Sequence, residues 1–191
     1  MQTQADIMRG QVDEMHTERR AWVTADIQIV EAVDYNVNGT HIGLLFNIRN
    51  IGKTPAVSVF PNLRANPFME GMEQAQREQC ANRASGGINV FPGDQRLQPI
   101  STDIPKEETD KFWEKYPTLR PMIFPTLIVC IVYRMPGEGT EHHTPFNFKL
   151  VRRHSDVEGR GAFAIFVDEG RVPVENLQLF DQSILFGGGP D

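Results

Sequence analysis

The chain has 191 residues, of which 40 % are hydrophobic and 23 % charged, which suits one folded domain with a substantial core. Its net charge of −6 argues against a nucleic-acid partner, because phosphate contacts need a concentrated basic face. The sequence has no apolar run of about 18 residues and no signal-peptide pattern at Met1, so we expect either a soluble protein or one whose membrane segment lies outside this chain.

Residues 1–22 predict a linker helix, because they are rich in Gln, Glu, Met and Arg and contain no proline. Met8, Val12, Met15 and Trp22 fall at heptad spacing. Arg19 occupies the same seam and the pattern covers only about two heptads. Two interpretations remain open: a coiled coil that oligomerises the protein, and a single amphipathic helix lying on the domain.

The next segment predicts strands. Apolar residues alternate with polar ones over 23–29 and again over 42–48, as in strands with one face in a core. Asn38-Gly39 is a strong hairpin signal, so the first two strands are expected to pair there. The corner 50–55 contains an Asn and a Gly that tolerate positive φ, and beyond it the alternation resumes over 57–63.

Two helical insertions are expected, near 68–84 and 105–116. Apolar residues on both faces of 127–133 predict a central strand that is buried on each side. The remaining expectations are short strands at 88–91, 96–100, 146–150 and 163–167, a final extended segment over 177–186, and a flexible tail at 187–191. Together these elements predict a mainly β protein: an immunoglobulin/fibronectin-like antiparallel β-sandwich over 23–186, with an N-terminal helix and helical insertions.

Candidate chemistry is sparse. His142 and His143 could bind a metal with Glu141 or Glu138, but neighbouring residues on a strand point to opposite faces, so we favour a polar hairpin shoulder. The sequence shows no nucleophile elbow, phosphate loop or dinucleotide motif, and we predict neither catalysis nor a cofactor.

The two cysteines, Cys80 and Cys130, have no CxxC spacing. We interpret Cys130 as a small buried hydrophobe within its apolar run. A disulfide with Cys80 is the less favoured alternative, because disulfides are rare in reducing compartments.

The predicted second insertion carries an aromatic stripe, Phe112, Trp113 and Tyr116. These residues either seal the helix onto the sheet or line a surface for a ligand or partner. Exposed edge strands offer another route to a partner, by strand addition.

Five phrases occur in order: Arg20-Ala21-Trp22-Val23, Asn50-Ile51-Gly52-Lys53-Thr54-Pro55-Ala56, Phe91-Pro92-Gly93, Cys130-Ile131-Val132-Tyr133 and His142-His143-Thr144-Pro145-Phe146. In this the chain resembles a group of uncharacterised proteobacterial proteins, in which a hydrophobic helix and a linker helix precede a β-rich domain. The resemblance implies membrane tethering through a segment absent from this chain; without such a segment, a cytoplasmic protein is expected.

We therefore predict a non-catalytic interaction module displayed near a bacterial membrane, with an unidentified protein partner and self-association through the N-terminal helix. The alternative is a small-molecule-binding, metal-binding or enzymatic domain that uses His142, His143 and nearby carboxylates.

Overall fold

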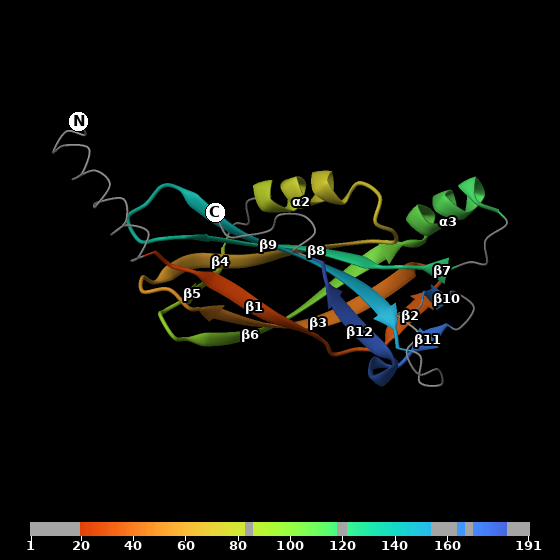
Figure 1. Cartoon of the computed structure of the whole chain (residues 1–191), viewed down its shortest axis with the longest axis horizontal. Coiled ribbons are helices and arrows are strands. Elements are labelled where there is room, and N and C mark those ends of the chain that lie inside the picture. Colours follow the sequence, from red (N-terminus) through yellow and green to blue (C-terminus); the bar gives the residue numbers. More distant parts are fainter. Residues whose placement is uncertain (1–19, 83–85, 118–121, 154–163, 167–169, 183–191) are drawn as a thin grey trace, which may run out of the picture.

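The computed structural model describes residues 20–82, 86–117, 122–153, 164–166 and 170–182. This part of the chain is mainly β and contains two α-helices (Figure 1). The elements, in chain order, are β1 (Val23–Ile29), β2 (Val33–Asn36), β3 (Gly39–Asn50), β4 (Ala56–Asn66), α2 (Met72–Ala81), β5 (Ile88–Val90), β6 (Gln95–Pro105), α3 (Lys106–Lys115), β7 (Met122–Ile123), β8 (Thr126–Arg134), β9 (Glu141–Arg152), β10 (Ile165–Phe166), β11 (Arg171–Val172), η2 (Val174–Asn176) and β12 (Leu177–Asp181).

Two antiparallel sheets enclose one hydrophobic core. In the first sheet, β3 pairs with β6 along one edge and with β1 and β2 along the other, and β11 extends β2. The second sheet has the order β12-β9-β8-β4-β5. The strands β7 and β10 form a separate small pair. The core draws on both sheets, which gives a sandwich-like arrangement.

The burial of β8 follows from its central place in the second sheet. Leu127, Val129 and Ile131 point into the core between the sheets. The residues between them, such as Ile128 and Cys130, point to the outer face, where α2 covers them. The prediction of a central strand buried on both sides is confirmed.

The corner after β3 joins the two sheets and does not join neighbouring strands. The β3–β4 and β5–β6 connections both change sheet, and they meet at Asn50, which is 1 % exposed. The Asn50 Nδ2 donates to the carbonyls of Thr54 (2.7 Å) and Val90 (3.0 Å). The Oδ1 accepts from the N–H groups of Gly52 (3.0 Å) and Trp22 (3.3 Å). One buried amide therefore holds both corners and the start of β1.

The reason predicted for this corner was wrong. Neither Asn50 nor Gly52 has a positive φ. Asn50 is there for its hydrogen bonds. Gly52 is there because a Cβ would lie 2.3 Å from the carbonyl oxygen of Arg20 and 2.5 Å from the nitrogen of Trp22.

The predicted hairpin is confirmed with a shift of one residue. The strands β2 and β3 pair from Asn36 and Gly39 onward, so Val37 and Asn38 form the loop. Gly39 opens β3 with φ +122°. The first strand, β1, pairs with the far half of β3 and takes no part in this hairpin.

Two prolines of β6 lie where their missing N–H cannot weaken a ladder. In β6, the bond from Lys106 N to Asn38 O (3.3 Å) shows that even-numbered residues face β3, so Pro99 and Pro105 direct their nitrogens to the free edge. In β9, odd-numbered residues face β12, as the bond from Gln182 N to Asn147 O (2.7 Å) shows. The next such residue toward the start of β9 is Pro145, which has no N–H to donate on that side. Strand addition at the edge of β6 that faces away from β3 is disfavoured.

The predicted helical insertions are observed as α2 and α3. Residues 20–22 are irregular and lead directly into β1. The predicted N-terminal helix otherwise lies outside the described residues, as does the tail 187–191. The last predicted extended segment, 177–186, is observed as β12 in its first half, and its residues 183–186 lie outside the described ranges.

Candidate functional site

Helix α3 is fixed to the sandwich by one inward face. Thr109 is fully buried, and its hydroxyl lies 3.3 Å from the Tyr35 hydroxyl. One turn later, Trp113 packs against the core and donates its indole N–H to the carbonyl of Met122 (3.3 Å). At the start of the helix, a hydrogen bond to Asp110 raises the pKa of the Lys106 ammonium, an effect that desolvation partly offsets. The orientation of α3 is therefore set by its own side chains.

The neighbouring face of α3 borders a groove of about 370 Å³, which we call the α3 groove. The opposite wall is the end of β4 and the chain that leads from it to α2. The lining residues are Arg64, Asn66, Pro67, Phe68, Glu70, Glu108, Lys111, Phe112 and Lys115. In Figure 1 both helices lie on the same side of the molecule.

Aromatic rings form the apolar part of the α3 groove. The rings of Phe68 and Phe112 stack with centroids 3.5 Å apart and an interplanar angle of 20°. The ring of Tyr116 follows at 4.8 Å from Phe112 and is itself 40 % exposed. The stack joins the chain after β4 to α3, so the platform is preformed.

Charged groups of both signs surround this platform. Lys111, Lys115, Glu70 and Glu108 line the groove, and none of them forms an ion pair with another residue in the described ranges. The Lys115 ammonium lies 5.4 Å from the centroid of the Tyr116 ring.

Asn66 offers a fixed hydrogen-bond donor to the α3 groove. The residue is 8 % exposed, and its Oδ1 accepts from Arg64 Nε at 3.0 Å. Its Nδ2 makes no hydrogen bond within the described part of the chain. Arg64 also reaches Glu78 through Nη1 at 3.4 Å.

The three residues of the aromatic stripe predicted from the sequence do not share one role. Trp113 seals α3 onto the sandwich, whereas Phe112 lines the groove and Tyr116 is exposed beside it. Phe68 and Asn66 were not predicted as site residues, because only the fold brings the end of β4 against α3. Their one signal in the sequence is the Pro67-Phe68 pair just after a strand.

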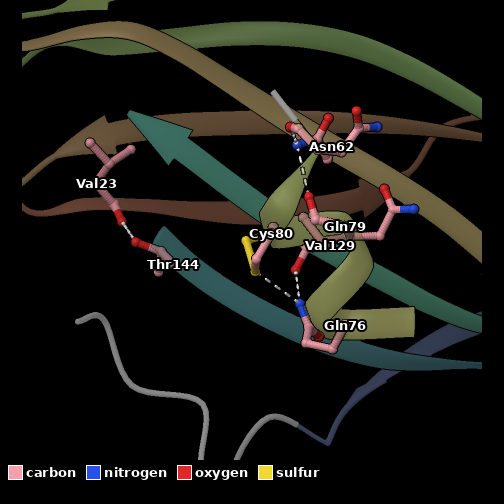
Figure 2. The surroundings of a disulfide bond; sticks show 9 residues. Val23, Asn62, Gln76, Gln79, Cys80, Val129 and Thr144 are labelled. Atoms are coloured by element: carbon pink, nitrogen blue, oxygen red, sulfur yellow. Dashed lines mark hydrogen bonds between the residues drawn. A yellow bond between two sulfur atoms is a disulfide. The ribbon is translucent and has the colours of Figure 1, made fainter. Parts of the chain in front are cut away.

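Helix α2 is held on the outer face of the second sheet by a disulfide. Cys80 and Cys130 form an S–S bond of 2.01 Å (Figure 2). Cys130 is buried, as predicted, but the preference for a small hydrophobe over a disulfide was wrong. Beside it, Gln76 Nε2 donates to the carbonyl of Val129 at 2.9 Å. The Asn62 amide donates to the carbonyls of Gln79 (3.0 Å) and Asn82 (2.9 Å).

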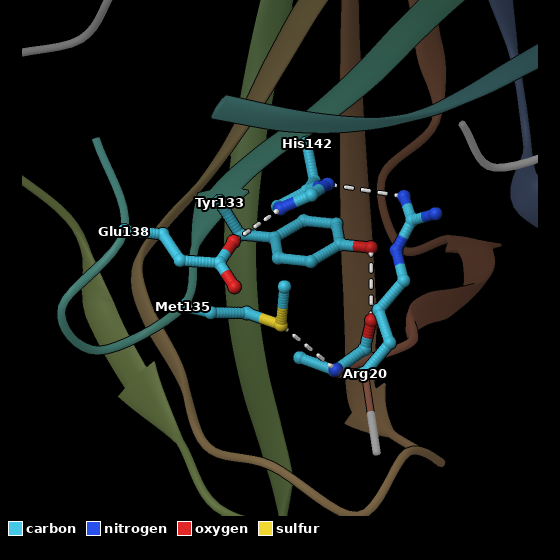
Figure 3. A network of polar contacts seen from close by, with 6 residues as sticks. Arg20, Tyr133, Met135, Glu138 and His142 are labelled. Carbon is cyan, nitrogen blue, oxygen red and sulfur yellow. Dashed lines mark hydrogen bonds and ion pairs between the residues drawn. The ribbon is translucent and has the colours of Figure 1, made fainter. Parts of the chain in front are cut away.

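The predicted histidine pair belongs to two different environments. His142 faces inward and lies between Arg20 and Glu138: its Nδ1 accepts from Arg20 Nη2 (3.0 Å), and its Nε2 lies 3.3 Å from Glu138 Oε2 (Figure 3). His143 is the next residue of the strand and faces the other side. Glu141 pairs with Arg134 instead.

The His142 network anchors the entry of the chain into the sandwich. Tyr133 donates its hydroxyl to the carbonyl of Ala21 (3.2 Å), and the Ala21 N–H points to the Met135 sulfur (3.3 Å). Across the described ranges, no group of three or more His, Cys, Asp or Glu residues could hold a metal ion. The structure therefore gives the metal alternative no support.

The other predicted contact residues belong to the N-terminal segment. Met8, Val12 and Met15 lie outside the described residues. Trp22 is half-buried beside Arg20, whose guanidinium lies 5.0 Å from the centroid of the Trp22 ring.

Comparisons place the chain beside no known protein: no family model, curated protein or solved structure matches it. Among the described residues, no helix combines the length and the hydropathy needed to cross a membrane.

Proposed function

We propose that this chain is a non-catalytic interaction module that holds a ligand in the α3 groove. The observation that carries the proposal is the preformed aromatic platform of Phe68 and Phe112. It is bordered by a buried amide donor and by charged groups that form no ion pair within the described ranges. Surface grooves that combine rigid aromatic rings with a few fixed polar groups are typical ligand sites. Since α3 is locked by Thr109 and Trp113, binding needs little rearrangement of the backbone.

The strand order supports an immunoglobulin-like type of sandwich. The strands β1, β3 and β6 would correspond to strands A, B and E, and β9, β8, β4 and β5 to strands G, F, C and C′. Such sandwiches commonly serve as rigid carriers of binding surfaces, which is an argument from fold analogy alone.

The disulfide supports a location in an oxidising compartment, where such bonds form and persist. The proposed display near a bacterial membrane and self-association through residues 1–22 rest on sequence resemblance and heptad spacing. The anchored entry at Arg20 is consistent with such a use of the N-terminal segment. Alkylation of thiols in intact cells tests the location, and a freely reactive Cys80 would contradict it.

Photo-crosslinking tests the groove. With p-benzoylphenylalanine in place of Lys111, at the rim of the α3 groove, we expect one discrete adduct in cells of the source organism. The same group in place of Leu97, which is 67 % exposed on β6, is the matched control and should give none. No adduct from position 111, or the same adducts from both positions, would contradict the proposal.

A further inference from the structure

We propose that the occupant of the α3 groove is a neutral oligosaccharide. This inference rests on the proposed function and adds the chemical class of the ligand. Three features of the groove carry it: the aromatic platform, the mixture of donors and acceptors, and the dimensions.

The aromatic platform suits a sugar ring. The C–H groups on one face of a pyranose carry small positive charges, and they pack favourably on the negative face of an aromatic ring. Phe68 and Phe112 line the groove and stack on one another, so a sugar ring would pack on an outward face of this stack. The ring of Tyr116 adjoins Phe112 at 4.8 Å.

The polar groups suit hydroxyls. A hydroxyl both donates and accepts hydrogen bonds, so it can pair with cationic donor side chains and with carboxylate acceptors. The α3 groove presents donors on Lys111, Lys115 and the Asn66 amide, and acceptors on Glu70 and Glu108. Because none of the four charged groups is neutralised by an ion pair within the described ranges, all are available to a ligand.

The same mixture disfavours a charged occupant. A polyanion such as an acidic peptide gains from the lysines but places its carboxylates beside Glu70 and Glu108. A polycation gains from the glutamates but places its positive charges beside Arg64 and the lysines, which repel them. A neutral ligand that carries many hydroxyls is repelled by neither set of charges.

The dimensions agree with a short oligosaccharide. A groove of about 370 Å³ lies within the range of small-ligand sites. It is bounded by α3 on one side and, on the other, by the end of β4 and the chain that follows it.

The test is an amide-resolved NMR titration of the intact chain with cellotetraose, maltotetraose, chitotetraose and mannotetraose, each up to about 10 mM. We expect at least one to shift the amides of Asn66, Phe68, Glu108 and Phe112 while Leu97 stays unmoved. Phe112→Ala should weaken that binding about tenfold or more, and Glu108→Gln by about three- to tenfold. Leu97→Ala is the matched control and should change nothing.

Two comparisons make the result decisive. An Asp- and Glu-rich peptide with a central Leu-Trp pair is titrated in parallel, and tighter binding of this peptide would overturn the inference in favour of a protein partner. Failure of all four sugars to shift the groove amides also overturns it. If an adduct still forms from position 111, only the ligand class is wrong, whereas absence of that adduct removes the proposed function itself.

Discussion

Replacing Asn50 should destabilise the protein, because this residue holds the corner at which the two sheets are joined. The Asn50 side chain makes four hydrogen bonds to backbone groups of three chain segments, and the residue is 1 % exposed. At about 1 kcal/mol for each bond, Asn50→Ala should lower the free energy of unfolding by about 4 kcal/mol. With a urea dependence of about 3 kcal/mol per M, the unfolding midpoint falls by about 1.3 M.

Urea unfolding followed by tryptophan fluorescence measures this effect, because Trp22 adjoins the corner. Asn50→Asp keeps the acceptor and replaces the donor, so its carboxylate faces the carbonyls of Thr54 and Val90 and should destabilise the fold at least as much. Asn38→Ala, in an exposed turn, is the control and should stay within about 0.5 kcal/mol of the wild type. A loss below about 1 kcal/mol for Asn50→Ala would refute the reasoning.

Three further changes test the supporting structure. Replacing Cys80 and Cys130 by alanine opens a loop closed over 50 residues and should cost about 4 kcal/mol, and reductant should then have no further effect on urea unfolding. Pro99→Thr restores an N–H on the free edge of β6 and should raise the mass measured by sedimentation at high concentration; an unchanged mass would count against edge protection. Trp113→Ala should cost about 3 kcal/mol by calorimetry, whereas Tyr116→Ala, at an exposed ring, should cost under about 1 kcal/mol; equal losses would contradict the inward anchoring of α3.

Much of the fold could be predicted because it depends on local patterns. Alternation identified β3, and a run that is apolar on both faces identified β8. The content of Gln, Glu and Arg identified α2, and Pro105 followed by acidic residues identified α3. The corner after β3 was located correctly, but its cause was not. A sequence shows that Asn50 permits a turn; only the fold shows that Val90, forty residues later, supplies one of its acceptors.

The candidate site could be predicted only in part, for the same reason. Phe112 and Tyr116 stood out because they lie four residues apart on one helix. Phe68 and Asn66 come from the end of β4 and meet α3 only after the chain has crossed between sheets. The disulfide likewise joins a helix to a strand 50 residues away, a pairing that cysteine spacing does not reveal.

The measurement that tests the central claim most directly is crosslinking from position 111 with and without the aromatic platform. The account predicts one adduct from p-benzoylphenylalanine at Lys111 in the otherwise native chain. Combining it with Phe112→Ala should abolish that adduct, because the ligand loses the stacked ring that Phe68 and Phe112 form. An adduct of unchanged yield in the Phe112→Ala background would contradict the assignment of the α3 groove as the binding site.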